Sequence, residues 1–217
     1  MKNIAVIARK GGSGKTTVAV NLAIAAHRRG YAVELADTDP QGSSSEVLKA
    51  RKGDGPLVVQ TTGEALHSER HKPAGLVNLR VIDTPAAAED SIGHAIALAQ
   101  VSVLVVRPTF LDLAATLQTA QILRRLRRPG LILLSQAPVP RGGVEPPAVK
   151  RALDALRLMQ LPVLPMILRS RAAYQTSLAL GCSVEELGAG PAADEIAELW
   201  TYLERFALGA RRSTEAA

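Results

Sequence analysis

Short runs of apolar residues alternate with stretches of helical periodicity along most of this chain. The apolar runs, each of strand length, lie at residues 4–7, 32–36, 57–59, 80–82, 101–106, 131–134 and 163–167. Apolar positions with helical spacing fall between them, at about residues 15–29, 89–99, 112–127, 147–159, 170–181 and 192–207. Continuously apolar strands that alternate with helices predict an α/β fold, a mostly parallel twisted sheet with helices on both faces. Pro165 lacks an N–H group and therefore places the last of these strands at an edge.

The same pattern predicts a single domain over residues 1–208 and a frayed C-terminal tail over residues 209–217. A length of 217 residues is ordinary for one domain, and neither an internal repeat nor a linker interrupts the pattern. The segment 137–147, rich in proline and glycine, is expected to form a long loop within the fold.

Composition narrows the class of protein. The single cysteine, Cys182, excludes a disulfide framework. No apolar run approaches the ~20 residues that cross a bilayer, and residues 1–8 are too few for a signal peptide, so we expect a cytoplasmic protein. Lys and Arg number 26 against 20 Asp and Glu, a net charge of +6. Such an excess is typical of proteins that bind polyanions, although solubility alone also accounts for it.

A glycine-rich segment with the form of a P-loop separates the first strand from the first helix. It reads Lys10-Gly11-Gly12-Ser13-Gly14-Lys15-Thr16-Thr17. Glycines in this position let backbone N–H groups turn inward onto phosphate oxygens, and the helix N-terminus adds the positive end of its dipole. In a P-loop, Lys15 reaches the β- and γ-phosphates and the Thr16 hydroxyl ligates Mg²⁺. The segment therefore predicts a nucleotide-binding site.

Aspartates follow two of the predicted strands. Asp37 and Asp39 end the strand at 32–36 in the string Asp-Thr-Asp-Pro-Gln-Gly, and Asp83 ends the strand at 80–82. Carboxylates at this edge of a parallel sheet can hold Mg²⁺ or orient water, although Asp37 and Asp39 could also serve as turn caps. Asp112 lies after the strand at 101–106, and we favour an N-cap role for it.

Together these motifs resemble the ParA/MinD family of deviant Walker-A ATPases, and most closely the short ParF-like plasmid partition ATPases. The resemblance covers residues 4–206, with Arg9 where the ordinary P-loop has glycine. It implies ATP and Mg²⁺ as cofactors and an ATP-bound homodimer in which Lys10 reaches the partner subunit's phosphates. It also implies that Asp39 orients the hydrolytic water, that Asp37 supports the Mg²⁺ shell, and that Asp83 holds Mg²⁺.

The resemblance further implies a place for the base and for DNA. It implies one adenine pocket formed by two segments, residues 135–136 and residues 166–167, with Gln136 as a binding residue. Sequence-independent binding to duplex DNA is assigned to Arg171, with Arg169 as a weaker candidate. The four arginines at 124–128 end a helix, where cations favour the helix dipole, so a solvated helix end is an equal alternative to DNA contact.

The function implied is that of a nucleoid-associated ATPase for DNA partition or cargo positioning. A ParB/ParG-like cargo adaptor would stimulate hydrolysis and release the dimer from DNA, without membrane contact.

A MinD-like membrane-surface ATPase is the alternative, because Leu199, Leu203 and Phe206 share one face of the final helix. Glutamates along that helix oppose contact with an anionic membrane and favour packing on the sheet.

Two other functions are weighed. A nitrogenase iron-protein role is excluded, because its bridging cluster needs two cysteines per chain and this chain has only Cys182. A dethiobiotin-synthetase-like ligase is less favoured, because it leaves the basic excess and the Asp-Pro-Gln-Gly string unexplained. His67 and His71, spaced i and i+4, are interpreted as solvated.

Overall fold

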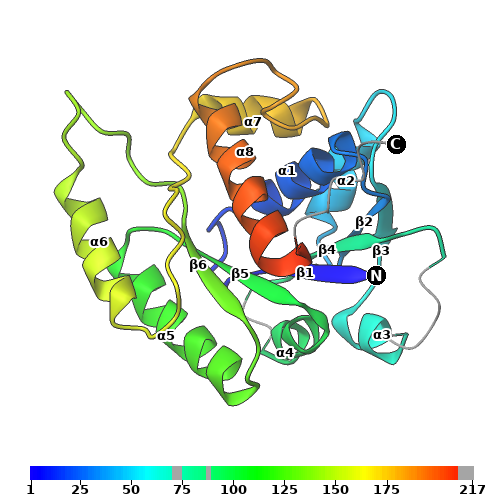
Figure 1. The fold of residues 1–217 in the computed structure, drawn as a ribbon, viewed down its shortest axis with the longest axis horizontal. Helices are drawn as coiled ribbons and strands as arrows, with labels where there is room; N and C mark the ends of the chain where they lie inside the picture. The colour runs from blue at the N-terminus through cyan, green and yellow to red at the C-terminus, as the bar shows by residue number, and fades with distance from the viewer. Residues whose placement is uncertain (70–74, 87–88, 210–217) are drawn as a thin grey trace, which may run out of the picture.

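The computed structural model describes residues 1–69, 75–86 and 89–209. Strands and helices alternate along the chain (Figure 1). The strands are β1 (Lys2–Ile7), β2 (Val33–Asp37), β3 (Leu57–Gln60), β4 (Leu79–Asp83), β5 (Val101–Val106) and β6 (Gly130–Leu134). The helices are α1 (Lys15–Arg28), α2 (Ser43–Lys49), α3 (Gly63–Ser68), α4 (Glu89–Leu98), α5 (Phe110–Arg125), α6 (Pro147–Arg157), α7 (Ala172–Ala179) and α8 (Pro191–Leu203). A short π-helical turn, Glu204–Leu208, continues α8.

The six strands form one parallel sheet in the order β3-β2-β4-β1-β5-β6. All carboxyl ends of the strands therefore lie at one edge, where the loops after β1, β2 and β4 meet. The register places Asp83 beside both Val6 and Asp37 on the neighbouring strands. The predicted α/β class with a parallel sheet is confirmed.

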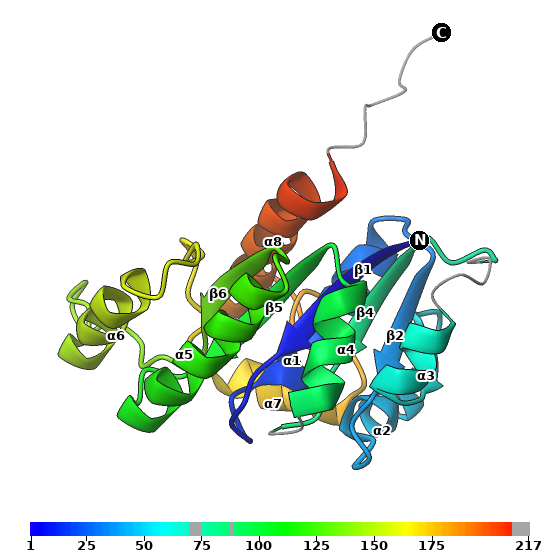
Figure 2. The same ribbon diagram turned by 90° about the horizontal axis from the view of Figure 1, so that it is seen from below.

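Helices cover both faces of the sheet (Figures 1 and 2). Alternate residues of each central strand point to opposite sides: Ile4 and Val6 pack against one set of helices, and Ala5 and Ile7 against the other. The first core includes residues of α1, α2, α7 and α8, and the second includes residues of α3, α4, α5 and α6. Ten of the fourteen residues of α1 are buried, because the sheet lies on one side of it and α8 on the other.

The prediction of a regular strand at residues 163–167 is wrong. This segment runs beside β6 with isolated bridges at Val163 and Arg169. Leu164 and Leu168 donate hydrogen bonds to carbonyls of β6 at 2.8 and 3.0 Å. Residues 162 and 164 make the hydrogen bonds to β6, so Pro165 faces the outer edge, where its missing N–H leaves no donor for a further strand. The expected edge position is correct.

Helices α2 and α3 were not expected from periodicity. Both are short, with seven and six residues, so apolar spacing has little length in which to show. Gly42 in the left-handed conformation precedes α2, and the Thr62 hydroxyl accepts a hydrogen bond from the Ala65 N–H at the start of α3.

The final helix, which was expected to pack on the sheet, packs against α1. Ile196, Leu199, Trp200 and Leu203 of α8 are all buried in the same core as α1. None of the helices in the described ranges is long and apolar enough to span a membrane. His71 and residues 210–217, nearly all of the predicted tail, lie outside the described residues.

Candidate functional site

The P-loop lies at the carboxyl edge of the sheet and leads directly into α1. Gly12 and Gly14 have φ angles of +70° and +97°, which favour glycine. A Cβ at Gly14 would lie 3.1 Å from the Ser135 hydroxyl, so the loop is also tightly packed against the end of β6. Ser13 is buried, whereas Lys10 is exposed at the rim. This geometry presents the loop backbone and the start of α1 to a phosphate group.

Lys15 is held inside this edge of the sheet. Its side chain is 7% exposed. Burial lowers the pKa of the Lys15 ammonium, while the nearby Asp83 and Asp39 carboxylates raise it. A partly dehydrated ammonium binds a phosphate group strongly, because the phosphate oxygens replace the water contacts that burial has removed.

Asp83 is fully buried, and neither of its carboxylate oxygens has a hydrogen-bond partner among the described residues. Burial raises the pKa of Asp83 to about 7. The nearby Thr16 hydroxyl opposes this shift, although the hydroxyl and the carboxylate do not form a hydrogen bond of standard geometry. The neighbouring Asp37 carboxylate raises the pKa, and Lys15 lowers it. An unpartnered buried carboxylate beside a threonine hydroxyl offers the oxygen ligands that Mg²⁺ prefers. Thr16 and Asp83 therefore fit the predicted metal site.

Asp37 and Asp39 shape the loop that follows β2. The Asp37 carboxylate accepts hydrogen bonds from the Asp39 N–H at 3.2 Å and the Ser45 N–H at 2.9 Å. Asp39 accepts from the Gln41 N–H at 3.0 Å and remains partly exposed. Both carboxylates thus cap turns, the alternative left open by the sequence. Only one oxygen of Asp39 is engaged in this way, and Asp39 is close enough to influence Lys15.

A cavity of about 290 Å³ opens beside the P-loop and fits the predicted base pocket. Gly14, Thr17, Ser135 and Gln136 line one side of it. Gln136, with a φ of +50°, donates a 2.8 Å hydrogen bond to the Gly12 carbonyl and so fixes the P-loop.

The other wall of this cavity comes from residues 168–175, not from the predicted residues 166–167. Met166 lines a separate hollow beneath α8, and Ile167 packs in the core under α6.

Arg169 and Arg171 line the same cavity and are both ion-paired. Arg169, 12% exposed, makes two hydrogen bonds to Glu145 at 2.7 and 2.8 Å. Arg171 donates to Glu195 at 2.8 Å, and Glu195 also accepts a hydrogen bond from the Tyr174 hydroxyl. These carboxylates neutralise much of the charge that the sequence assigned to DNA. The two ion pairs also hold the cavity wall in place.

Arg107 is a residue of this edge that sequence reasoning missed. Its guanidinium bridges Asp112, at 3.0 and 3.2 Å, and the Gly11 carbonyl of the P-loop, at 3.4 Å. The predicted N-cap at Asp112 is wrong: Thr109 caps α5, and Asp112 occupies the first turn, where its N–H donates to the Thr109 hydroxyl. A Thr-x-x-Asp spacing is the signal that would have located the cap.

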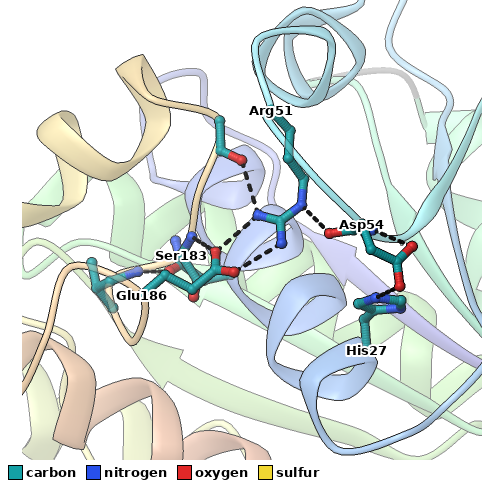
Figure 3. A network of polar contacts seen from close by, with 9 residues as sticks. His27, Arg51, Asp54, Ser183 and Glu186 are labelled. Atoms are coloured by element: carbon teal, nitrogen blue, oxygen red, sulfur yellow. Dashed lines mark hydrogen bonds and ion pairs between the residues drawn. The ribbon is translucent and has the colours of Figure 1, made fainter.

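An ion-pair network fastens α2, and with it the loop of Asp37 and Asp39, to the C-terminal part of the chain (Figure 3). Arg51 follows α2 and binds both oxygens of Glu186 at 2.9 and 2.8 Å. It also donates to the carbonyls of Asp54 and Gly181. The Glu186 carboxylate accepts from the Ser183 N–H, and His27 contacts Asp54.

Comparisons with known proteins find nucleotide-binding relatives of this chain. A family model described as the CobQ/CobB/MinD/ParA nucleotide binding domain matches residues 4–199. Maintenance of carboxysome distribution protein A from Halothiobacillus neapolitanus is 31% identical over 208 residues, which cover 90% of this chain and 93% of the relative.

Two solved structures share the fold. An ATP complex of McdA from Cyanothece superposes with a TM-score of 0.78 at 17% identity, with 99% of each chain covered. The septum site-determining protein MinD from Pyrococcus horikoshii, solved with Mg-ADP, gives a TM-score of 0.76 at 20% identity, with 97% of this chain and 99% of that chain covered.

Proposed function

The chain belongs to the CobQ/CobB/MinD/ParA nucleotide-binding family, and we propose that it is a ParA-type ATPase that positions a cellular cargo. It is a P-loop ATPase with ATP and Mg²⁺ as cofactors. The observation that carries the proposal is the meeting of Lys15, Thr16 and the unpartnered Asp83 carboxylate at one edge of the sheet.

Each residue of this edge has a distinct task in the proposed reaction. The P-loop backbone binds phosphate oxygens, and Lys15 neutralises charge on the β- and γ-phosphates. Thr16 and Asp83 would hold Mg²⁺, which supplies positive charge at the transferring phosphoryl group. Asp39, whose second oxygen makes no hydrogen bond to the described residues, orients the attacking water.

A homodimer completes the proposed site. Lys10 is exposed at the rim of the P-loop, where it can reach phosphates bound by a second copy. Phe110 and Leu111, 82% and 63% exposed, start α5 at the same edge of the sheet and offer apolar area for that contact. ATP bound between two chains would therefore stabilise the dimer, and hydrolysis would release it.

The relative from Halothiobacillus neapolitanus favours a protein body of the carboxysome kind as cargo. A nucleoid-bound ATP dimer would hold an adaptor on that cargo, and adaptor-stimulated hydrolysis would release it. A plasmid cargo, which the ParF-like resemblance implies, stays a prediction. The MinD-like membrane alternative is less favoured, because α8 buries Leu199 and Leu203 against α1.

Size-exclusion chromatography with light scattering tests the proposal. Asp39→Ala with Mg²⁺ and ATP should elute as a dimer and hydrolyse no ATP. Lys15→Ala should stay monomeric, because it loses the phosphate contact. An Asp39→Ala protein that binds ATP yet remains monomeric at micromolar concentration would refute the dimer mechanism.

A further inference from the structure

Four arginines gather at the C-terminal end of α5. All four side chains, those of Arg124, Arg125, Arg127 and Arg128, are exposed. Arg124 makes a hydrogen bond to Gln160, and none of the four joins an ion pair with a described carboxylate. They therefore lack the direct ion pairs that Arg169 and Arg171 make, although Arg125 lines a hollow that Glu64 and Asp90 also line.

Helix capping accounts for only part of this cluster. The C-terminal end of a helix carries about half a negative charge, which one or two cations of the last turn balance. Arg124 and Arg125 occupy that turn. Arg127 and Arg128 lie beyond the end of α5, and Arg127 has a φ of +50°, a conformation that arginine rarely adopts. The cluster thus holds more positive charge than α5 needs.

The cluster continues into an open hollow of about 750 Å³ along the flank of α5. The hollow is lined by Arg9, Gln118, Gln121, Ile122, Arg124 and Arg125. Arginine and glutamine side chains are typical donors to phosphate oxygens of nucleic acid, and such contacts need no base sequence. We call these polar residues, together with Arg127 and Arg128, the α5 surface.

We propose that the α5 surface binds the phosphate backbone of duplex DNA without sequence preference. This inference rests on the proposed function and moves its DNA contact from Arg169 and Arg171 to α5. Membrane-binding helices combine basic residues with several large apolar side chains on one face. Beside the α5 surface, the exposed large apolar side chains of this part of the helix are Leu117 and Leu126, 44% and 40% exposed, so basic and polar groups predominate and DNA fits better than a lipid surface.

A triple variant, Arg125→Gln/Arg127→Gln/Arg128→Gln, tests the assignment against a control with the same change in net charge. The control, Arg28→Gln/Arg141→Gln/Arg205→Gln, removes exposed arginines from other parts of the surface. Fluorescence anisotropy with a 24-base-pair duplex, in Mg²⁺ with ATP or ADP, gives the affinity at several salt concentrations. ATP hydrolysis and urea midpoints show that both variants are folded.

We expect the α5 variant to bind the duplex on the order of 100-fold more weakly at 0.1 M salt, because each lost phosphate contact removes about 0.9 from the salt slope. The control should lose less than about threefold. Equal losses in both variants, or none in the α5 variant, would overturn the assignment.

Two further outcomes separate this inference from the proposed function. A wild-type ATP dimer that sediments with phosphatidylglycerol vesicles but does not bind DNA would overturn the inference while ATP-driven dimerisation stands. Absence of an ATP-dependent dimer would instead refute the proposed function itself.

Discussion

Replacing Asp83 by asparagine should stabilise the nucleotide-free protein at alkaline pH. The carboxylate is fully buried, its oxygens lack hydrogen-bond partners in the part of the chain that the structure describes, and its pKa is raised from 3.8 to about 7, mainly by burial. At ~1.4 kcal/mol per pH unit, this displacement corresponds to about 4 kcal/mol of unfavourable free energy above pH 7. The asparagine amide replaces a protonated carboxyl of similar shape that is equally unpartnered, so a gain of up to about 4 kcal/mol is expected.

The sign of the pH dependence follows from proton binding. Between pH 4 and 7 the folded protein holds a proton on Asp83 that the unfolded chain has released, so this group lowers stability as pH rises. Asp83→Asn removes that contribution. The difference between variant and wild type should therefore be large at pH 8 and should approach zero at pH 4, where the protonated carboxyl carries no charge.

Urea denaturation at pH 4, 6 and 8, with and without Mg²⁺ and a non-hydrolysable ATP analogue, measures these differences. Ligand should raise the urea midpoint of the wild type at pH 8 much more than that of Asp83→Asn, because the variant lacks the metal ligand. A variant that is less stable than wild type at pH 8 without ligand would refute the assignment of an uncompensated buried charge.

Three more changes have defined outcomes. Lys15→Ala should abolish tight ATP binding in isothermal titration calorimetry, and unchanged affinity would contradict the P-loop assignment. Arg51→Gln should lower unfolding stability at pH 7 by about 1–3 kcal/mol through loss of its charged hydrogen bonds. Arg51 lowers the pKa of Glu186, so this contribution is present above pH 4.5 and should shrink at lower pH, as urea titrations at pH 7 and 3.5 would show. Trp200→Ala should cost about 3–5 kcal/mol in the same assay, because Trp200 is fully buried against α1.

Local features of the site were predictable because their signals are contiguous in sequence. The P-loop lies between a run of apolar residues and a helical pattern, and Asp37 and Asp83 end two such runs. Parallel pairing then brings the carboxyl ends of β1, β2 and β4 together without further information. Six of the seven expected strands are present for the same reason.

The ion pairs could not be predicted because they depend on tertiary contacts. Glu145 and Glu195 each lie 24 residues from the arginine that they bind. The residues of each pair are too far apart in sequence for the repeat of a helix or a strand to bring them together. Arg107 likewise contacts a P-loop carbonyl that is 96 residues away. A basic residue in a sequence therefore indicates available charge only after its carboxylate neighbours in space are known.

The burial of α1 between the sheet and α8 has a consequence for biosynthesis. Helix α1 is made immediately after β1, but α8 leaves the ribosome about 160 residues later. At ordinary translation rates this delay lasts roughly 8 to 30 seconds, during which the outer face of α1 has no cover. The nascent chain should therefore bind chaperones that recognise aliphatic helices, and fragments that stop before α8 should aggregate.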